Sequence, residues 1–164
     1  MIFVHKFLTK CRENKAKTLI FTQFLKMLDL LRQYCSMAGI LFETLDGSVN
    51  YDERQNRIDN FNNNPNVLVF VISTKAGGVG INLTSATNII IYDSDWNPQN
   101  DIQAIARAHR IGQHKNVSVY RLITSQTYED ILYKTAVKKL GIGLAILDNE
   151  YFNNQALNPN DKRK

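Results

Sequence analysis

Two arginines and a glutamine in the second half of the chain could act on a phosphate group. Gln103, Arg107 and Arg110 follow one another at spacings of four and three residues, which would place them on one stripe of a helix. A guanidinium is charged at any working pH, and its planar fork matches phosphate oxygens bidentately. The pair could therefore act as arginine fingers in phosphoryl transfer; the alternative is an ordinary solvated helix face. His109 lies off this stripe, which favours packing or hydrogen bonding over general-base catalysis.

A glycine-rich loop precedes the arginines and follows an apolar run over residues 67–72. Gly77, Gly78 and Gly80 have no Cβ, so their backbone N–H groups could approach a phosphate closely; the alternative is a tight turn that needs positive φ. The loop is not a P-loop, because no Gly-Lys-Ser/Thr follows, and Leu83 stands where Gly-x-Gly-x-x-Gly needs its third glycine. A strand that leads into a glycine loop and then an arginine helix is typical of a nucleotide-driven motor.

The motifs of a self-sufficient ATPase do not occur in the sequence. There is neither a Gly-x-x-x-x-Gly-Lys-Thr, whose lysine binds the β- and γ-phosphates, nor an Asp-Glu-x-His/Asp that would hold magnesium. We therefore expect the isolated chain not to hydrolyse ATP. No metal site is expected either, because Cys11 and Cys35 have no Cys-x-x-Cys or histidine partner at ligand spacing.

Short β-branched and aromatic runs alternate with helical patterns and must position these residues. Strands are predicted over residues 18–22, 41–45, 67–72, 88–92 and 117–122, all too evenly apolar to be half-exposed. Helices are predicted over residues 24–38, from Asn50 onward and over residues 103–113. Asn50 would cap its helix while Glu53 bonds back to it. The alternation predicts an α/β fold with a mainly parallel sheet and helices on both faces.

Several polar residues follow the predicted strands directly. Thr22, Asp46, Ser73 and Asp93 all stand at strand carboxyl ends. Because these ends meet at one edge of a parallel sheet, where binding residues collect, we expect the four to lie at the same edge.

Length and charge restrict the class of protein. The 164 residues fit one domain. Twenty Lys and Arg against 15 Asp and Glu give a formal net charge of +5, which favours an anionic partner without identifying it. No apolar run reaches the roughly 18 residues of a membrane span, and the first residues lack the features of a signal peptide. We expect a soluble intracellular protein.

Five motifs in this order resemble the C-terminal motor lobe of the Swi/Snf-like ATPases of helicase superfamily 2. They are residues 18–24, 45–48, 73–83, 93–101 and 103–113, and the resemblance extends over roughly Lys15 to Leu147. Within the family, residues 81–86, 120–124 and 139–141 look most like the chromodomain-helicase branch, and the imitation-switch type comes second.

The resemblance implies a RecA-like three-layer α/β sandwich with a C-terminal helical extension. Together with the pattern at the chain's ends, it divides the chain into four parts. These are a leader helix over residues 1–14, the lobe over residues 15–126, a helical brace over residues 127–150 and a disordered basic tail over residues 151–164. A break in the brace is expected near Gly141 and Gly143, because glycine is unfavourable within a helix.

The resemblance also implies roles at the nucleotide. ATP would lie between this lobe and an N-terminal lobe that supplies the phosphate lysine and magnesium, and Arg107 and Arg110 would reach across the gap. Gln103 would place the γ-phosphate or the attacking water, unless it is a plain surface residue. Gly80 would face the nucleotide together with Gly78, and Asn82 would lie near it.

Duplex DNA would be held by groups that contact phosphates rather than bases. The candidates are Gln23, Ser48, Ser73, Thr74 and Lys75. Trp96 lies in an acidic stretch that disfavours phosphate, so it would couple DNA engagement to lobe closure, or else be a buried anchor. Asp93 and Asp95 are expected to be structural partners of nearby basic groups.

The implied function is ATP-driven translocation on duplex DNA, with nucleosomes as further partners, in the nucleus and away from membranes. Because no base-reading element is recognisable, binding should be unspecific and strongly salt dependent. Two alternatives remain: a stand-alone nucleic-acid-binding module without motor activity, and an unrelated doubly wound nucleotide enzyme.

Overall fold

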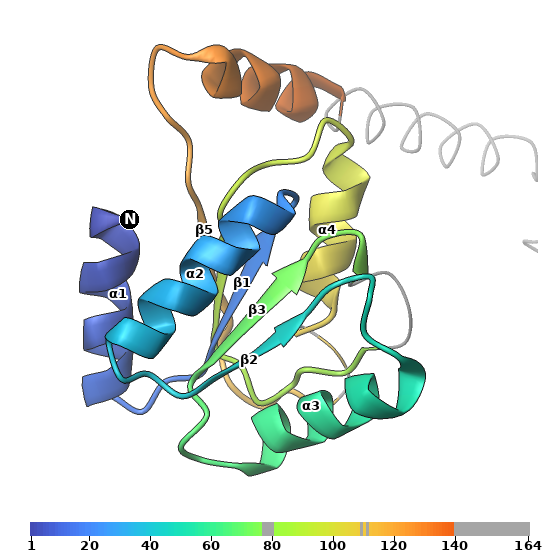
Figure 1. The fold of residues 1–164 in the computed structure, drawn as a ribbon. Helices are drawn as coiled ribbons and strands as arrows, with labels where there is room; N and C mark the ends of the chain where they lie inside the picture. The colour runs from blue at the N-terminus through green and yellow to red at the C-terminus, as the bar shows by residue number, and fades with distance from the viewer. Residues whose placement is uncertain (77–80, 109, 111, 140–164) are drawn as a thin grey trace, which may run out of the picture. The chain divides into compact units, whose positions relative to one another are not determined.

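The computed structural model describes residues 1–76, 81–108, 110 and 112–139. Strands and helices alternate along most of the chain, although no helix is described between the strands at Val69–Ser73 and Asn88–Ile91 (Figure 1). The elements are α1 (Ile2–Glu13), β1 (Thr18–Thr22), α2 (Leu25–Met37), β2 (Phe42–Leu45), α3 (Tyr51–Asn63), β3 (Val69–Ser73), β4 (Asn88–Ile91), α4 (Pro98–Ala106) and β5 (Ser118–Arg121). Two compact units are distinguished, Met1–Ile123 and a second that begins at Thr124. In the second unit residues 128–139 are helical, and the predicted break at Gly141 and Gly143 lies outside the described residues.

The sheet of the first unit is parallel throughout and has the strand order β2-β3-β1-β4-β5 in the described part of the chain. The central strand β1 pairs Thr18 with Val69 of β3 on one side and with Asn88 of β4 on the other. This confirms the predicted α/β fold with a parallel sheet. Helices connect β1 to β2, β2 to β3 and β4 to β5, as is usual between parallel strands.

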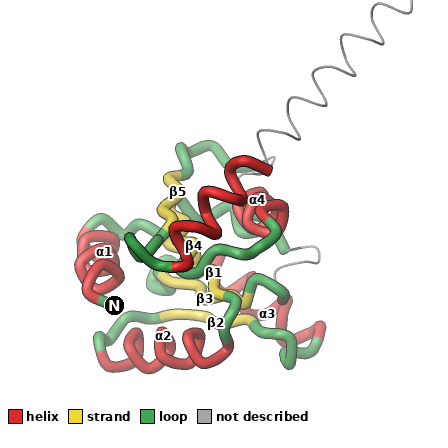
Figure 2. Tube along the Cα trace, turned by 90° about the horizontal axis from the view of Figure 1, so that it is seen from above, coloured by secondary structure: helices red, strands yellow, loops and turns green. Residues whose placement is uncertain are grey.

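Two apolar layers cover the two faces of the sheet, with α3 and α4 on one side and α1 and α2 on the other (Figure 2). Alternate residues of β1 supply both layers, since successive side chains of a strand point to opposite faces. Leu19 and Phe21 pack in the α3–α4 layer, and Ile20 packs in the α1–α2 layer. All five residues of β1 and of β3 are buried, which confirms for these two strands that they are not half-exposed.

Two expectations about burial were wrong in part. The edge strand β5 is largely exposed, because an edge strand has a neighbour on one side only. Phe24 belongs to the apolar repeat predicted for residues 24–38, but it is the N-cap of α2 and is 66% exposed.

Both cysteines are buried, and burial raises the pKa of Cys35 to about 11, so Cys35 is a protonated core residue at neutral pH. None of the helices that are described is long and apolar enough to span a membrane.

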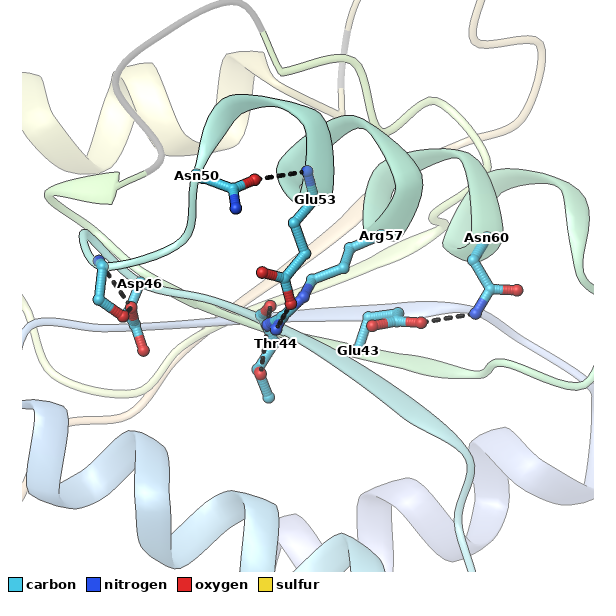
Figure 3. A network of polar contacts seen from close by, with 8 residues as sticks. Glu43, Thr44, Asp46, Asn50, Glu53, Arg57 and Asn60 are labelled. Carbon is cyan, nitrogen blue, oxygen red and sulfur yellow. Dashed lines mark hydrogen bonds and ion pairs between the residues drawn. The ribbon is translucent and has the colours of Figure 1, made fainter.

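At the start of α3, one of the two predicted bonds between Asn50 and Glu53 is present (Figure 3). The Asn50 side chain accepts a hydrogen bond from the Glu53 N–H at 2.8 Å, which confirms the cap. The Glu53 carboxylate, however, accepts from Arg57, one turn along the helix, and not from the Asn50 N–H. A charged partner at this spacing is the stronger donor. Arg57 also donates to the Thr44 carbonyl at 2.6 Å and so ties α3 to β2.

The end of α3 is held by Lys17, which precedes β1. The Lys17 ammonium donates to the carbonyl of Phe61 and to those of Asn62 and Asn64 at 3.2 and 3.0 Å. These groups belong to the last turn of α3 and its C-cap, where carbonyls have no partner within the helix. A cation at a helix C-terminus also interacts favourably with the helix dipole.

Replacing Lys17 by Met should lower the free energy of unfolding by about 1–3 kcal/mol, because three carbonyls lose a charged donor while the apolar stem is kept. Urea unfolding followed by circular dichroism measures the effect. Lys6→Met is the matched control: Lys6 is exposed on α1, so a change within about 0.5 kcal/mol is expected. Equal stability of the two variants would show that Lys17 does not cap α3.

Candidate functional site

The carboxyl ends of three strands are held together at one edge of the sheet. The Thr22 hydroxyl of β1 donates to the Asp93 carboxylate after β4 at 2.7 Å, and the Gln23 N–H donates to the same carboxylate at 2.6 Å. The Thr74 N–H, after β3, donates to the Thr22 carbonyl at 2.9 Å. Asp93 is 9% exposed. Two bonds that hold it come from a hydroxyl and a backbone amide, and the expected pairing with a basic group stays a prediction.

A cavity of about 790 Å³ opens at this edge, and three of the residues predicted to contact DNA line it. These are Gln23, Ser73 and Lys75. Ser73 is 4% exposed, whereas Lys75 is exposed. Sequence reasoning did not find the rest of the lining, which includes the apolar side chains of Phe24, Leu25, Met27 and Leu30. Their only signal was the position of Phe24 directly after the Thr-Gln at the end of β1.

The remaining candidates for DNA contact lie beside this cavity or apart from it. Ser48 is exposed and follows Gly47, which lines the cavity. Its N–H donates to the Asp46 carboxylate at 2.8 Å, and the bonds from Ser48 lower the pKa of Asp46, so this carboxyl stays charged. Trp96, between β4 and α4, is 63% exposed. The alternative of a buried anchor is therefore wrong, because the side chain is on the surface.

The helix that carries Gln103 and Arg107 is shorter than predicted. α4 ends at Ala106, Arg107 is its C-cap, and Arg110 lies beyond it. The expectation of a single helical stripe through Arg110 was therefore wrong. The first N–H groups after the helix bond three residues back, Arg107 to Ala104 and Ala108 to Ile105. The Arg107 carbonyl accepts from the Leu83 N–H at 3.1 Å, so a distant segment takes part in ending the helix.

Residues 81–86, which follow the glycine loop in sequence, hold the segment beyond α4. Arg110 lies 3.5 Å from the Ile81 carbonyl. The Gln113 amide donates to the carbonyls of Thr84 and Ala86 at 2.8 and 2.7 Å. Both arginines are thus linked to the chain just after the loop predicted to approach phosphate.

The exposure of the nucleotide candidates differs. Gln103 and Arg110 are exposed, Arg107 is half-buried, and Asn82 is exposed with its carbonyl accepting from Asn62 at 2.9 Å. Gly78, Gly80 and His109 lie outside the described residues. Among the residues that the structure describes, no group of three or more His, Cys, Asp or Glu side chains could hold a metal ion.

The arginines and the acidic loop lie at opposite ends of α4. The helix has nine residues, so at 1.5 Å per residue its ends are roughly 13 Å apart. Trp96 precedes the N-terminal end, where Asn97 caps the helix by accepting from the Gln99 N–H at 3.2 Å. Trp96 and the two arginines are therefore separated by the length of α4.

A buried ion pair fixes the first turn of α4, and sequence reasoning did not find it. Arg121 of β5 donates to the Asp101 carboxylate and, at 2.8 Å, to the Ser94 hydroxyl. The Asp101 side chain is 3% exposed and that of Arg121 is 25% exposed. Burial raises the pKa of Asp101, and the bond to Arg121 opposes this rise. The two residues are 20 positions apart, and no local pattern connects them.

Comparison with known proteins gives the family to which this chain and its fold belong. Residues 2–112 match the helicase conserved C-terminal domain. The crystal structure of the C-terminal part of the Fun30 ATPase domain superposes with a TM-score of 0.78 at 42% identity, over 82% of this chain and 44% of that one. The chain belongs to the helicase C-terminal domain family and has its RecA-like α/β fold.

The relatives show which group of helicases within this family the chain resembles. The chain is 48% identical to mouse chromodomain-helicase-DNA-binding protein 1-like over 87% of its length. It is 45% identical to the mouse SWI/SNF-related matrix-associated actin-dependent regulator of chromatin subfamily A member 1 over 90%, and 44% identical to human lymphoid-specific helicase over 92%. It is the C-terminal lobe of a Swi/Snf-like superfamily 2 ATPase, as its motifs indicated. The chain spans only 16%, 14% and 18% of these relatives, respectively.

Proposed function

We propose that this chain is the second motor lobe of an ATP-dependent DNA translocase that acts on chromatin. One observation carries the proposal furthest: Arg107 and Arg110 are linked to residues 81–86, directly after the glycine loop. Two arginines held to the segment that follows, in sequence, a loop suited to phosphate are what a lobe needs to complete a nucleotide site from one side. A first lobe would form the other side of the site.

In this proposal ATP lies between the two lobes, and the first lobe supplies the phosphate lysine and the magnesium ligands. Arg107 and Arg110 neutralise charge on the transferring phosphoryl group, and Gln103 orients the γ-phosphate or the attacking water. Asn82 and the glycine loop with Gly78 and Gly80 form the near wall. Closure and opening of the lobes then move the protein along DNA.

Duplex DNA is proposed to run along the edge formed by the strand ends. The cavity lined by Gln23, Ser73 and Lys75 lies there, and Ser48 and Thr74 stand at the ends of the neighbouring strands. These groups contact phosphates, so binding is unspecific and weakens steeply with salt. Trp96, exposed in the loop before α4, would couple DNA engagement to lobe closure. The names of two relatives mention DNA binding and chromatin, which supports nucleosomes as partners and the nucleus as location.

A comparison of this chain alone with a two-lobe protein that contains it tests the proposal. We expect no ATP turnover by the chain alone and DNA-stimulated turnover by the two-lobe protein, because each lobe holds only part of the phosphate site. ATP turnover is measured with and without duplex DNA. Turnover by a clean preparation of the chain alone would contradict the proposal.

The second candidate function is a stand-alone nucleic-acid-binding module. DNA affinity, measured on the same two-lobe protein, distinguishes it from a motor lobe. A motor lobe in the two-lobe protein should bind duplex DNA with an affinity that changes when a non-hydrolysable ATP analogue is added. A simple binding module should bind equally well in both conditions. Fluorescence anisotropy with a labelled duplex, repeated at several salt concentrations, measures both the affinity and its salt dependence.

A further inference from the structure

We infer that Gln113 is a positioning residue for the arginine segment and fixes Arg110 relative to the nucleotide. This inference rests on the proposed function. Gln113 stands at the end of the motif that carries the arginines, but the resemblance gives it no role. In the structure Gln113 is half-buried. Its backbone bonds to the arginine segment and its side chain bonds to residues 81–86.

The backbone of Gln113 bonds to the arginine segment. Its N–H donates to the Arg110 carbonyl at 3.0 Å. Gly112, between the two, has φ +105, a conformation that glycine adopts readily and other residues rarely adopt. This turn brings the backbone of Gln113 back to that of Arg110.

The side chain of Gln113 bonds to the segment after the glycine loop. Its amide N–H groups donate to the carbonyls of Thr84 and Ala86, at 2.8 and 2.7 Å, while its amide oxygen accepts from the Lys115 N–H at 2.9 Å. Two carbonyl acceptors on one side and an N–H donor on the other fix the orientation of the amide.

The segment that receives these bonds is part of the core. Ile81, Leu83 and Ala86 are 1%, 0% and 0% exposed, so residues 81–86 cannot shift without disturbing packed side chains. Gln113 therefore connects Arg110 to a rigid segment of the core. The bond from the Leu83 N–H to the Arg107 carbonyl holds the other arginine to the same segment.

A catalytic group that is displaced by about 1 Å can lose on the order of 10²-fold in rate while the fold persists. Gln113→Met keeps the length and neutrality of the side chain but removes both donors to Thr84 and Ala86. In the two-lobe protein we expect kcat for ATP to fall by about 10- to 100-fold, with the KM values for ATP and DNA changed by less than about threefold. Gln113→Arg restores donors to the two carbonyls and should recover most of the lost kcat.

A matched variant separates positioning from a general loss of stability. Arg57→Met removes side-chain bonds to the Thr44 carbonyl and hydroxyl of β2, neither of which involves residues 81–86, and should leave kcat unchanged. A second readout does not depend on activity: hydrogen exchange of the Leu83 amide should speed up in Gln113→Met but not in Arg57→Met. Normal kcat in Gln113→Met, or an equal loss of kcat in Arg57→Met, would overturn the inference.

Arg110→Ala, measured in parallel, distinguishes a failure of the inference about Gln113 from a failure of the proposed function. If Arg110→Ala loses turnover and Gln113→Met keeps it, the proposed function stands and the role of Gln113 is refuted. If neither variant loses turnover, the role of Gln113 and the finger role of Arg110 are both refuted. If Gln113→Met loses kcat together with protection of the Leu83 amide, and Gln113→Arg recovers both, the inference is supported.

Discussion

Arg110→Ala should lower ATP turnover by the two-lobe protein by about 10³- to 10⁵-fold, the range typical for loss of an arginine finger. The guanidinium would act only when the lobes close on ATP, so the loss should appear in kcat. The fold should persist, because Arg110 is exposed and surface substitutions usually change stability little. DNA-stimulated ATPase assays and thermal unfolding of the same preparations measure both properties.

Two further variants make this prediction specific. Arg32→Ala removes an arginine that is exposed on α2 and has a surface ion pair with Asp29 at 3.5 Å, so it should leave turnover unchanged. Arg110→Lys keeps the charge but not the planar fork, and its turnover should lie between those of Arg110→Ala and the unchanged protein. Arg107→Ala should also lose activity. Full activity in both alanine variants at positions 107 and 110 would refute the arginine-finger role.

Arg121→Met should destabilise the chain by roughly 3 kcal/mol, because it leaves the Asp101 carboxylate buried without its cation. The low end of the range for buried pairs is expected, since the Arg121 side chain is 25% exposed while that of Asp101 is 3% exposed. Denaturant unfolding at neutral pH measures the loss. Arg32→Met, on the surface of α2, is the matched control and should stay within about 0.5 kcal/mol of the unchanged chain.

The loss in Arg121→Met should depend on pH in a definite direction. Burial already raises the pKa of Asp101, and removing Arg121 raises this pKa further. A carboxyl whose pKa is higher in the folded than in the unfolded state takes up a proton on folding. Its contribution to stability is therefore present at low pH and is lost as pH rises through the folded pKa. The deficit of the variant should shrink as pH falls from about 7 toward the ordinary carboxyl range near 4.

The double variant Asp101→Asn with Arg121→Met tests this cause. An amide has no charge to bury, so the double variant should be more stable than Arg121→Met at neutral pH and should lose the additional pH dependence. A loss that is the same at all pH values would show that packing of the Arg121 stem, and not the buried carboxylate, explains the effect.

Features that depend on neighbouring residues could be predicted from the sequence. The bounds of β1 agree with the predicted strand, and the cap of α3 is at Asn50 as predicted. The parallel order of the sheet follows from the alternation of strands and helices. The spacing of the five motifs was sufficient to indicate the family, because a motif keeps its chemistry within a few residues of chain.

Features that depend on distant residues could not be predicted in this way. The stripe from Gln103 to Arg110 looked helical, but the chain leaves the helix at Arg107, where a carbonyl bonds to Leu83. The apolar lining beside Gln23 arises because Phe24 and Leu25 are exposed at the start of α2. Trp96 could have been buried or exposed, and only the packing of the loop before α4 decides between the two.

The α/β class, the family and the residue types that could contact phosphate could be predicted from the chain alone, since these depend on local periodicity and motif spacing. Where α4 ends, what holds the arginines and how the Asp101 charge is compensated became visible only in the folded molecule. The physical reason is that these features depend on bonds between residues 20 to 29 positions apart, such as Arg121 with Asp101 and Gln113 with Thr84. Folding brings these groups together, and no pattern within a short window of chain encodes the pairing.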